Sequence, residues 1–195
     1  MGWTSYQATY FTNGKINRKA ECDAYFMEGV NAGHFEILKS SMRGSVYYAA
    51  VKDMVRYVGR DGNGKSVYEP IEDGDVWAAV FLTSVKGNEF YYKDMDETCG
   101  PCYYDCPKSI LSLLSKTDSK WANEWRKKCI EESEKPSLSK LSIGTTIRVK
   151  IGNAEEVLAT KHKPAYQFKR PFWKTENGYL KTSYIKNREW SVVNV

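Results

Sequence analysis

The sequence lacks most of the features that would assign a protein to a functional class at once. No apolar run reaches the roughly 18–20 residues of a membrane-spanning helix. Only two histidines occur, His34 and His162, neither of them beside a nucleophile motif, and no Gly-x-Ser-x-Gly sequence is present. These absences exclude no fold, but they give no support to an enzyme or to a membrane partner.

Cysteines are few and odd in number, and the N-terminus has neither the basic nor the apolar region of a secretory signal. Five cysteines without such a signal do not fit a disulfide framework. We therefore expect a cytoplasmic protein with reduced thiols.

What is present is a globular composition with an uneven distribution of charge. Of 195 residues, 42% are hydrophobic, 27% are charged and 14% are aromatic, which excludes a disordered chain. The net charge is +5: residues 136–195 carry 11 Lys and Arg against 4 Glu, a net +7, and residues 1–135 carry 18 against 20, a net −2. The asymmetry predicts a basic C-terminal face for nucleic acid or an acidic partner.

The order of hydrophobic patterns predicts an α+β fold with two parts. For residues 1–135 we expect a mixed domain with antiparallel strands at about 2–11, 46–58, 76–85 and 89–93 and with two or three helices, at 17–30, after Pro107 and after a cap at Asp118. In the last helix, Trp121, Trp125 and Cys129 recur every four residues and should share one buried face.

The C-terminal part changes in character after a polar stretch at 131–140, which contains Pro136 and is the best linker. Five short β-type runs follow, at 145–151, 156–160, 166–173, 179–185 and 190–193. Residues 136–195 are therefore expected to form a small, basic, β-rich module, either a small barrel or a curled antiparallel sheet, of which we favour the barrel.

The segment 162–174 interleaves basic and aromatic side chains. This is the chemistry of a platform that stacks bases and contacts phosphates, and the same surface also suits an acidic protein. The predicted binding residues are Lys163, Tyr166, Lys169, Arg170, Phe172, Trp173 and Lys174. Further cations that extend the patch are Lys161, Lys181, Lys186 and Arg188. The alternative is that the rings form a core and the lysines a solvated face.

A cluster of cysteines offers a second chemistry. Cys99-Gly100-Pro101-Cys102 has the active-site sequence of thioredoxins, but acidic residues at 94, 96 and 97 would oppose thiolate formation. Cys99, Cys102 and Cys106 have the spacing of a zinc knuckle that lacks its fourth ligand, which Cys22, Cys129 or Asp105 would have to supply. We expect the cysteines to be structural thiols and the protein to bind no cofactor. The alternative is a bound zinc ion.

A glycine-rich stretch, Gly59-Arg60-Asp61-Gly62-Asn63-Gly64-Lys65-Ser66, matches the phosphate-loop pattern. That motif must open a helix whose N-terminus completes the anion site. Pro70 follows too closely for a regular helix. The stretch is therefore predicted to be the solvated tip of a hairpin.

Four longer blocks carry a resemblance that covers almost the whole chain: GWTSY at 2–6, NGKINRKAECD at 13–23, YKDMDETCGPCYYDCP at 92–107 and PAYQFKRPFW at 164–173. With these blocks the chain resembles a family of small uncharacterised proteins encoded on phages, plasmids and conjugative elements of gut bacteria. Such accessory genes often counter host defence, and anti-CRISPR proteins are among them.

The resemblance implies a non-enzymatic accessory protein in the cytoplasm of a bacterial host. Its partner would be a defence nuclease, such as a type II CRISPR effector nuclease or another defence protein, or the DNA or RNA of that nuclease. The alternative function is that of a cysteine-dependent accessory protein, stabilised by zinc or acting through thiol redox chemistry.

Overall fold

The computed structural model describes residues 2–151, 155–165, 168–185 and 188–193. The chain divides into two compact units, Met1–Glu134 and Lys135–Val195, and each has its own antiparallel sheet and its own core. The fold is mixed α+β, as predicted.

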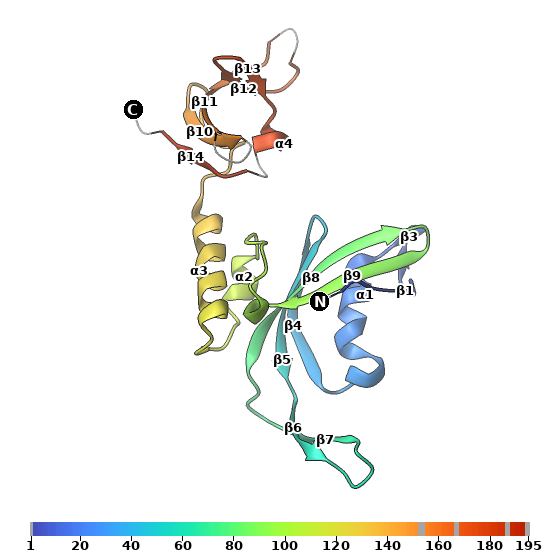
Figure 1. The fold of residues 1–195 in the computed structure, drawn as a ribbon. Coiled ribbons are helices and arrows are strands. Elements are labelled where there is room, and N and C mark those ends of the chain that lie inside the picture. The colour runs from blue at the N-terminus through green and yellow to red at the C-terminus, as the bar shows by residue number, and fades with distance from the viewer. Residues whose placement is uncertain (1, 152–154, 166–167, 186–187, 194–195) are drawn as a thin grey trace. The chain divides into compact units, whose positions relative to one another are not determined.

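The N-terminal unit is a five-stranded antiparallel sheet with helices on both faces (Figure 1). The strand order is β1 (Thr4–Gln7), β9 (Glu89–Asp96), β8 (Val76–Lys86), β5 (Val46–Asp53) and β4 (Phe35–Arg43). One face packs against α1 (Arg18–Met27), and the other against α2 (Lys108–Leu111) and α3 (Lys120–Glu134).

The central strand β5 explains why both faces need a cover. Its side chains alternate between two cores: Tyr47 and its neighbours at 49 and 51 pack with Cys22 and Phe26 of α1. The residues between them, Tyr48 included, pack with Trp125 of α3. A strand buried on both faces reads as a continuous apolar run rather than as an alternating one.

Smaller elements complete this unit. Asn17 caps α1, because its side-chain oxygen accepts from the Ala20 amide at 3.1 Å. The remaining elements are the hairpin β2 (Phe11–Thr12) and β3 (Lys15–Ile16), the 3₁₀ turns η1 (Gly29–Asn31) and η2 (Glu97–Cys99), and the hairpin β6 (Val55–Arg60) and β7 (Ser66–Pro70).

Two expectations for the helix α3 need correction. Its first turn is capped by Ser119, whose hydroxyl accepts from the Ala122 amide at 3.3 Å, rather than by Asp118. Trp125 and Cys129 are buried as expected, but Trp121 is 64% exposed. Trp121 lies in the first turn near the loop at Gly100, where an added Cβ would lie 3.6 Å from its ring.

A buried ion pair ties α3 to the sheet. Nε and Nη2 of Arg126 donate to the two carboxylate oxygens of Glu97 at 2.5 and 2.6 Å. Its Nη1 donates to the Ser115 carbonyl at 2.6 Å. Glu97 also accepts from the Ala78 amide of β8 at 3.2 Å. The pair therefore joins η2, α3 and β8 at one buried point.

The C-terminal unit is a second five-stranded antiparallel sheet (Figure 1). Its strand order is β13 (Gly178–Leu180), β12 (Phe172–Thr175), β11 (Glu155–His162), β10 (Thr146–Ile151) and β14 (Trp190–Val192), with α4 (Thr182–Ile185) after β13. Within the described part of this unit β13 and β14 do not pair, so the sheet stays open and the expected barrel is not supported. The core gathers Leu138, Ile147, Val149, Ala159, Trp173 and Ile185.

No helix in the described part of the chain is long and apolar enough to cross a membrane.

Candidate nucleic-acid interface

The sequence-predicted basic aromatic segment forms the end of β11, the start of β12 and the loop between them. Along these strands the side chains alternate between the core and the outer face of the sheet. Ala159 and Trp173 are fully buried, whereas Lys174 is exposed and His162 and Phe172 are half-buried. Alternate residues of the segment therefore belong to the core and to the surface.

Four rings of the outer face form a continuous series, which we call the ring ladder: His162, Phe172, Phe168 and Tyr179. Phe172 stacks on His162, its partner across the strand pair, with centroids 5.6 Å apart and an interplanar angle of 21°. On its other side Phe172 stacks on Phe168 at 4.3 Å, and Phe168 meets the edge of Tyr179 at 4.5 Å. Tyr179 is 53% exposed, so it is the most accessible ring of the series.

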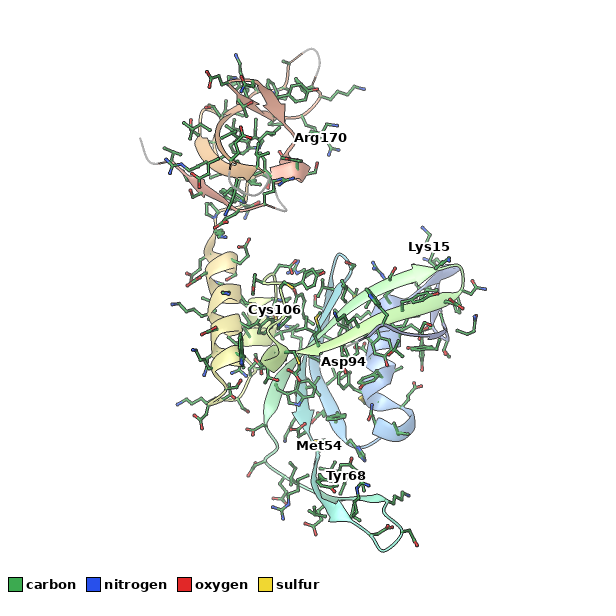
Figure 2. All side chains as sticks on the ribbon, viewed as in Figure 1. Lys15, Met54, Tyr68, Asp94, Cys106 and Arg170 are labelled. Carbon is green, nitrogen blue, oxygen red and sulfur yellow. The ribbon has the colours of Figure 1, made fainter. Side chains whose placement is uncertain are left out.

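Exposed cations surround the ring ladder. Lys163 follows His162 at the end of β11, Lys169 and Arg170 follow Phe168, and Lys174 lies on β12 directly opposite Tyr179. All four are exposed, and Figure 2 labels Arg170 on this unit. Among the described residues none of the four has an ion-pair partner, so their charge is available to a polyanion.

Other cations of the C-terminal unit are already engaged. Arg148 and Lys150 of β10 lie 3.7 and 3.5 Å from Glu156 and Glu189. Arg188 covers the ring of Tyr184 at 4.1 Å. Lys140 and Lys181, in contrast, are exposed and have no ion-pair partner among the described residues, so free positive charge of this unit is not confined to the ring ladder.

Trp173 was predicted to contact a ligand, and the structure corrects this. Its ring is fully buried in the core, where its indole nitrogen donates to the Thr182 hydroxyl at 3.2 Å. Because Trp173 alternates with Phe172 along β12, only one of the two adjacent rings can face solvent. Tyr166 lies outside the described residues, as does Lys186.

Lys161 was expected to extend the basic patch and instead points inward. Its ammonium group is buried and donates to the carbonyls of Leu138, Ser139 and Leu141 at 3.0, 3.0 and 2.6 Å. It also lies 5.9 Å from the Trp173 ring centre. Lys161 therefore binds the preceding segment of its own chain and takes no part in the surface.

The cysteine cluster is divided by burial. Cys99 and Cys102 are exposed, whereas Cys106, which Figure 2 labels, is buried together with Cys129 in the core beneath α3. Burial raises the pKa of the Cys106 thiol, and the same cause raises that of Cys129 to about 12. Within the described ranges no three His, Cys, Asp or Glu side chains form a group able to hold a metal ion.

The Cys-Gly-Pro-Cys loop also differs from a thioredoxin site. Cys99 ends the short turn η2 instead of opening a helix, and its amide donates to the Asp96 carboxylate at 3.0 Å. That carboxylate already occupies the Cys99 amide, whereas in a redox enzyme a helix N-terminus stabilises the thiolate. The loop therefore lacks the helix N-terminus that makes the thiol of this motif reactive in thioredoxins.

The glycine-rich stretch is a hairpin tip, as predicted. Ser66 begins the strand β7 rather than a helix. Asp61 accepts from the amides of Asn63 and Lys65, both at 2.9 Å, so the loop's own carboxylate occupies the donors that a phosphate would need.

Comparison with known proteins adds no further identification: no protein-family model, no curated protein and no solved structure matches the chain.

Proposed function

We propose that the C-terminal unit binds single-stranded nucleic acid through the outer face of its sheet. The observation that carries the proposal is the juxtaposition of a partly exposed ring ladder with four exposed cations that have no ion-pair partner among the described residues. Rings accept the faces of unpaired bases whatever their sequence, and the cations follow the phosphates. Tyr179, with Lys174 opposite it, is the natural place for the first stacked base.

The resemblance to proteins of mobile elements extends this proposal to a partner. We propose that the bound strand belongs to a host defence nuclease, such as a type II CRISPR effector nuclease, and that the protein is a non-enzymatic inhibitor in the bacterial cytoplasm. A cleavage assay with such a nuclease tests this step separately. Inhibition that is lost in a charge variant of the ring-ladder face supports it, and undiminished cleavage at saturating protein contradicts it.

The binding step is tested by fluorescence anisotropy with a labelled oligothymidylate over a range of salt concentrations. Replacing Lys163, Lys169 and Arg170 by alanine removes three phosphate contacts and should lower the salt slope of binding by about two. Affinity then falls most at low salt. A matched control replaces three exposed lysines of the N-terminal unit, Lys15, Lys86 and Lys116, and changes the net charge equally.

The stacking step has its own variant. Tyr179→Ala should weaken binding by about 1–3 kcal/mol at every salt concentration, because stacking is not screened. Thermal melts confirm that each variant is folded. The proposal fails if the charge variant binds as well as its control. It also fails if neither the charge variant nor Tyr179→Ala binds more weakly than the wild type, because the face is then only a solvated surface.

A further inference from the structure

The hairpin formed by β6 and β7 is a second surface that the proposed function does not use. It extends beyond the five-stranded sheet of its own unit (Figure 1), and Figure 2 labels Tyr68 on it. Four of its large apolar side chains are exposed: Tyr57 by 56%, Val58 by 44%, Val67 by 38% and Tyr68 by 43%. Apolar side chains gathered on an exposed hairpin mark an interaction surface rather than a core.

The register of the hairpin places its rings on one face. Tyr57 pairs with Tyr68, and the two rings meet edge to face at 5.8 Å. The His34 ring lies against Tyr68, with ring centroids 4.5 Å apart. Arg60 pairs with Ser66, two residues from Tyr68, so it shares the face of the rings at the end nearer the tip.

Charge is separated along the hairpin. The tip carries Arg60 and Lys65, and the segment after β7 carries Glu72, Asp73 and Asp75. All five are exposed, and none has an ion-pair partner among the residues that the structure describes. Between the two ends Arg56 and Glu69 neutralise each other at 3.2 Å. The tip also holds Asp61, whose carboxylate accepts from the loop amides, so Arg60, Asp61 and Lys65 together give the tip a net charge of +1.

We infer that two copies of this chain associate through the hairpin, with the tyrosine faces together and the two hairpins antiparallel about a two-fold axis. A two-fold axis brings the same patch of both copies together, so any contact of tip with base occurs twice. In that arrangement the basic tip of each copy lies over the acidic base of the other, and the rings close the centre. The hairpin is thus complementary to itself in charge as well as in apolar surface.

Sedimentation equilibrium over a concentration series measures the association. Because two hairpins bury less surface than a standard interface, the dissociation constant should be roughly 10–100 μM. The mass should rise from 22.4 kDa toward twice that value. Added salt should weaken the association, and Tyr57→Ser with Tyr68→Ser should raise the dissociation constant at least about tenfold.

Paired charge reversals separate this arrangement from non-specific adhesion. One variant reverses the tip (Arg60→Glu with Lys65→Glu), and the other reverses the base (Glu72→Lys with Asp73→Lys). Each alone should remain monomeric, because both ends of its hairpin then carry the same sign. An equimolar mixture should regain the mass of a pair, since each tip again meets a base of opposite sign.

Three results would each overturn the inference. They are a wild-type protein that stays at the monomer mass up to the highest concentration, a mixture that fails to recover association although both variants melt like the wild type, and a tyrosine variant that associates as well as the wild type.

Discussion

At the scale of single residues, burial divides chemically identical side chains into different functional classes. Cys22, Cys106 and Cys129 are enclosed by the two cores of the N-terminal unit, whereas Cys99 and Cys102 lie on an exposed loop. Burial is the first cause that raises the pKa of each enclosed thiol, because a thiolate loses its hydration there. Nearby carboxylates act in the same direction.

This division predicts thiol reactivity. At pH 8 a maleimide or an aromatic disulfide reagent should modify two of the five cysteines of the folded protein within minutes, and the other three only after denaturation. Mass spectrometry of the peptides identifies them. Modification of Cys106 at the rate of Cys99 would contradict the assignment, and about one equivalent of zinc in the purified protein would revive the metal alternative.

Two rings on the neighbouring strands β12 and β13 should likewise separate stability from binding. Trp173→Ala removes a buried ring and should lower the free energy of unfolding of the C-terminal unit by about 3–5 kcal/mol. Tyr179→Ala, at an exposed position, should change it by well under half of that amount. Denaturant titrations of the two variants provide the measurement, and equal losses would show that Tyr179 belongs to the core.

At the scale of elements, the Glu97–Arg126 pair fixes α3 and the cysteine loop to the sheet. Glu97→Gln leaves the partly buried Arg126 guanidinium without its counter-charge and should cost up to about 3–5 kcal/mol of unfolding free energy. Asp23→Asn breaks the half-exposed pair with Lys19, 2.7 Å apart, and serves as the contrast, with a loss below about 1 kcal/mol from that pair. The Tyr47 hydroxyl can still donate to the new amide oxygen. A loss for Glu97→Gln as small as that would show that solvent reaches the pair.

The hairpin tip allows a negative prediction at the same scale. We expect neither the wild-type protein nor Lys65→Ala to bind nucleotides detectably. The reason is that β7 offers no helix N-terminus and Asp61 already occupies the loop amides. Isothermal titration with ATP and GTP checks this. Micromolar binding that disappears in the variant would restore the phosphate-loop interpretation.

The elements also show how far the sequence alone could lead. Helix α1 and strands β5, β8, β9 and β10 follow patterns that local sequence displays, and they were predicted. Strand β4 was missed because a register shift between Ile37 and Lys39 breaks its alternation. In the candidate site the mixture of rings and cations was visible, but which ring faces solvent depends on strand phase. The ladder partners Phe168, His162 and Tyr179 were missed because cross-strand pairing brings them together.

At the scale of the whole molecule, the buried thiols predict how stability depends on pH. An unfolded thiol titrates near its ordinary pKa of 9.0, whereas the enclosed thiols keep their protons to a higher pH. Above pH 9 the unfolded state therefore binds fewer protons than the folded state, and stability falls as the pH rises. Each thiol contributes up to about 1.4 kcal/mol per pH unit within its window, which for Cys129 extends to about 12.

Guanidinium titrations between pH 8 and about 11 measure this slope. Cys129→Ala removes one of the three contributions and should reduce the slope above pH 9 while leaving the region below it flat. A slope that is unchanged in this variant would mean that tyrosine ionisation, rather than thiol ionisation, governs alkaline unfolding.

The inward-pointing Lys161 has a consequence for where the C-terminal unit can be cut. Its ammonium group is satisfied entirely by carbonyls of residues 138–141, which precede the first strand of that unit. A fragment that starts at residue 142 would lose these three acceptors together with Leu138 of the core. A fragment that starts at residue 135 keeps the acceptors and Leu138, so the compact C-terminal unit begins before its sheet does.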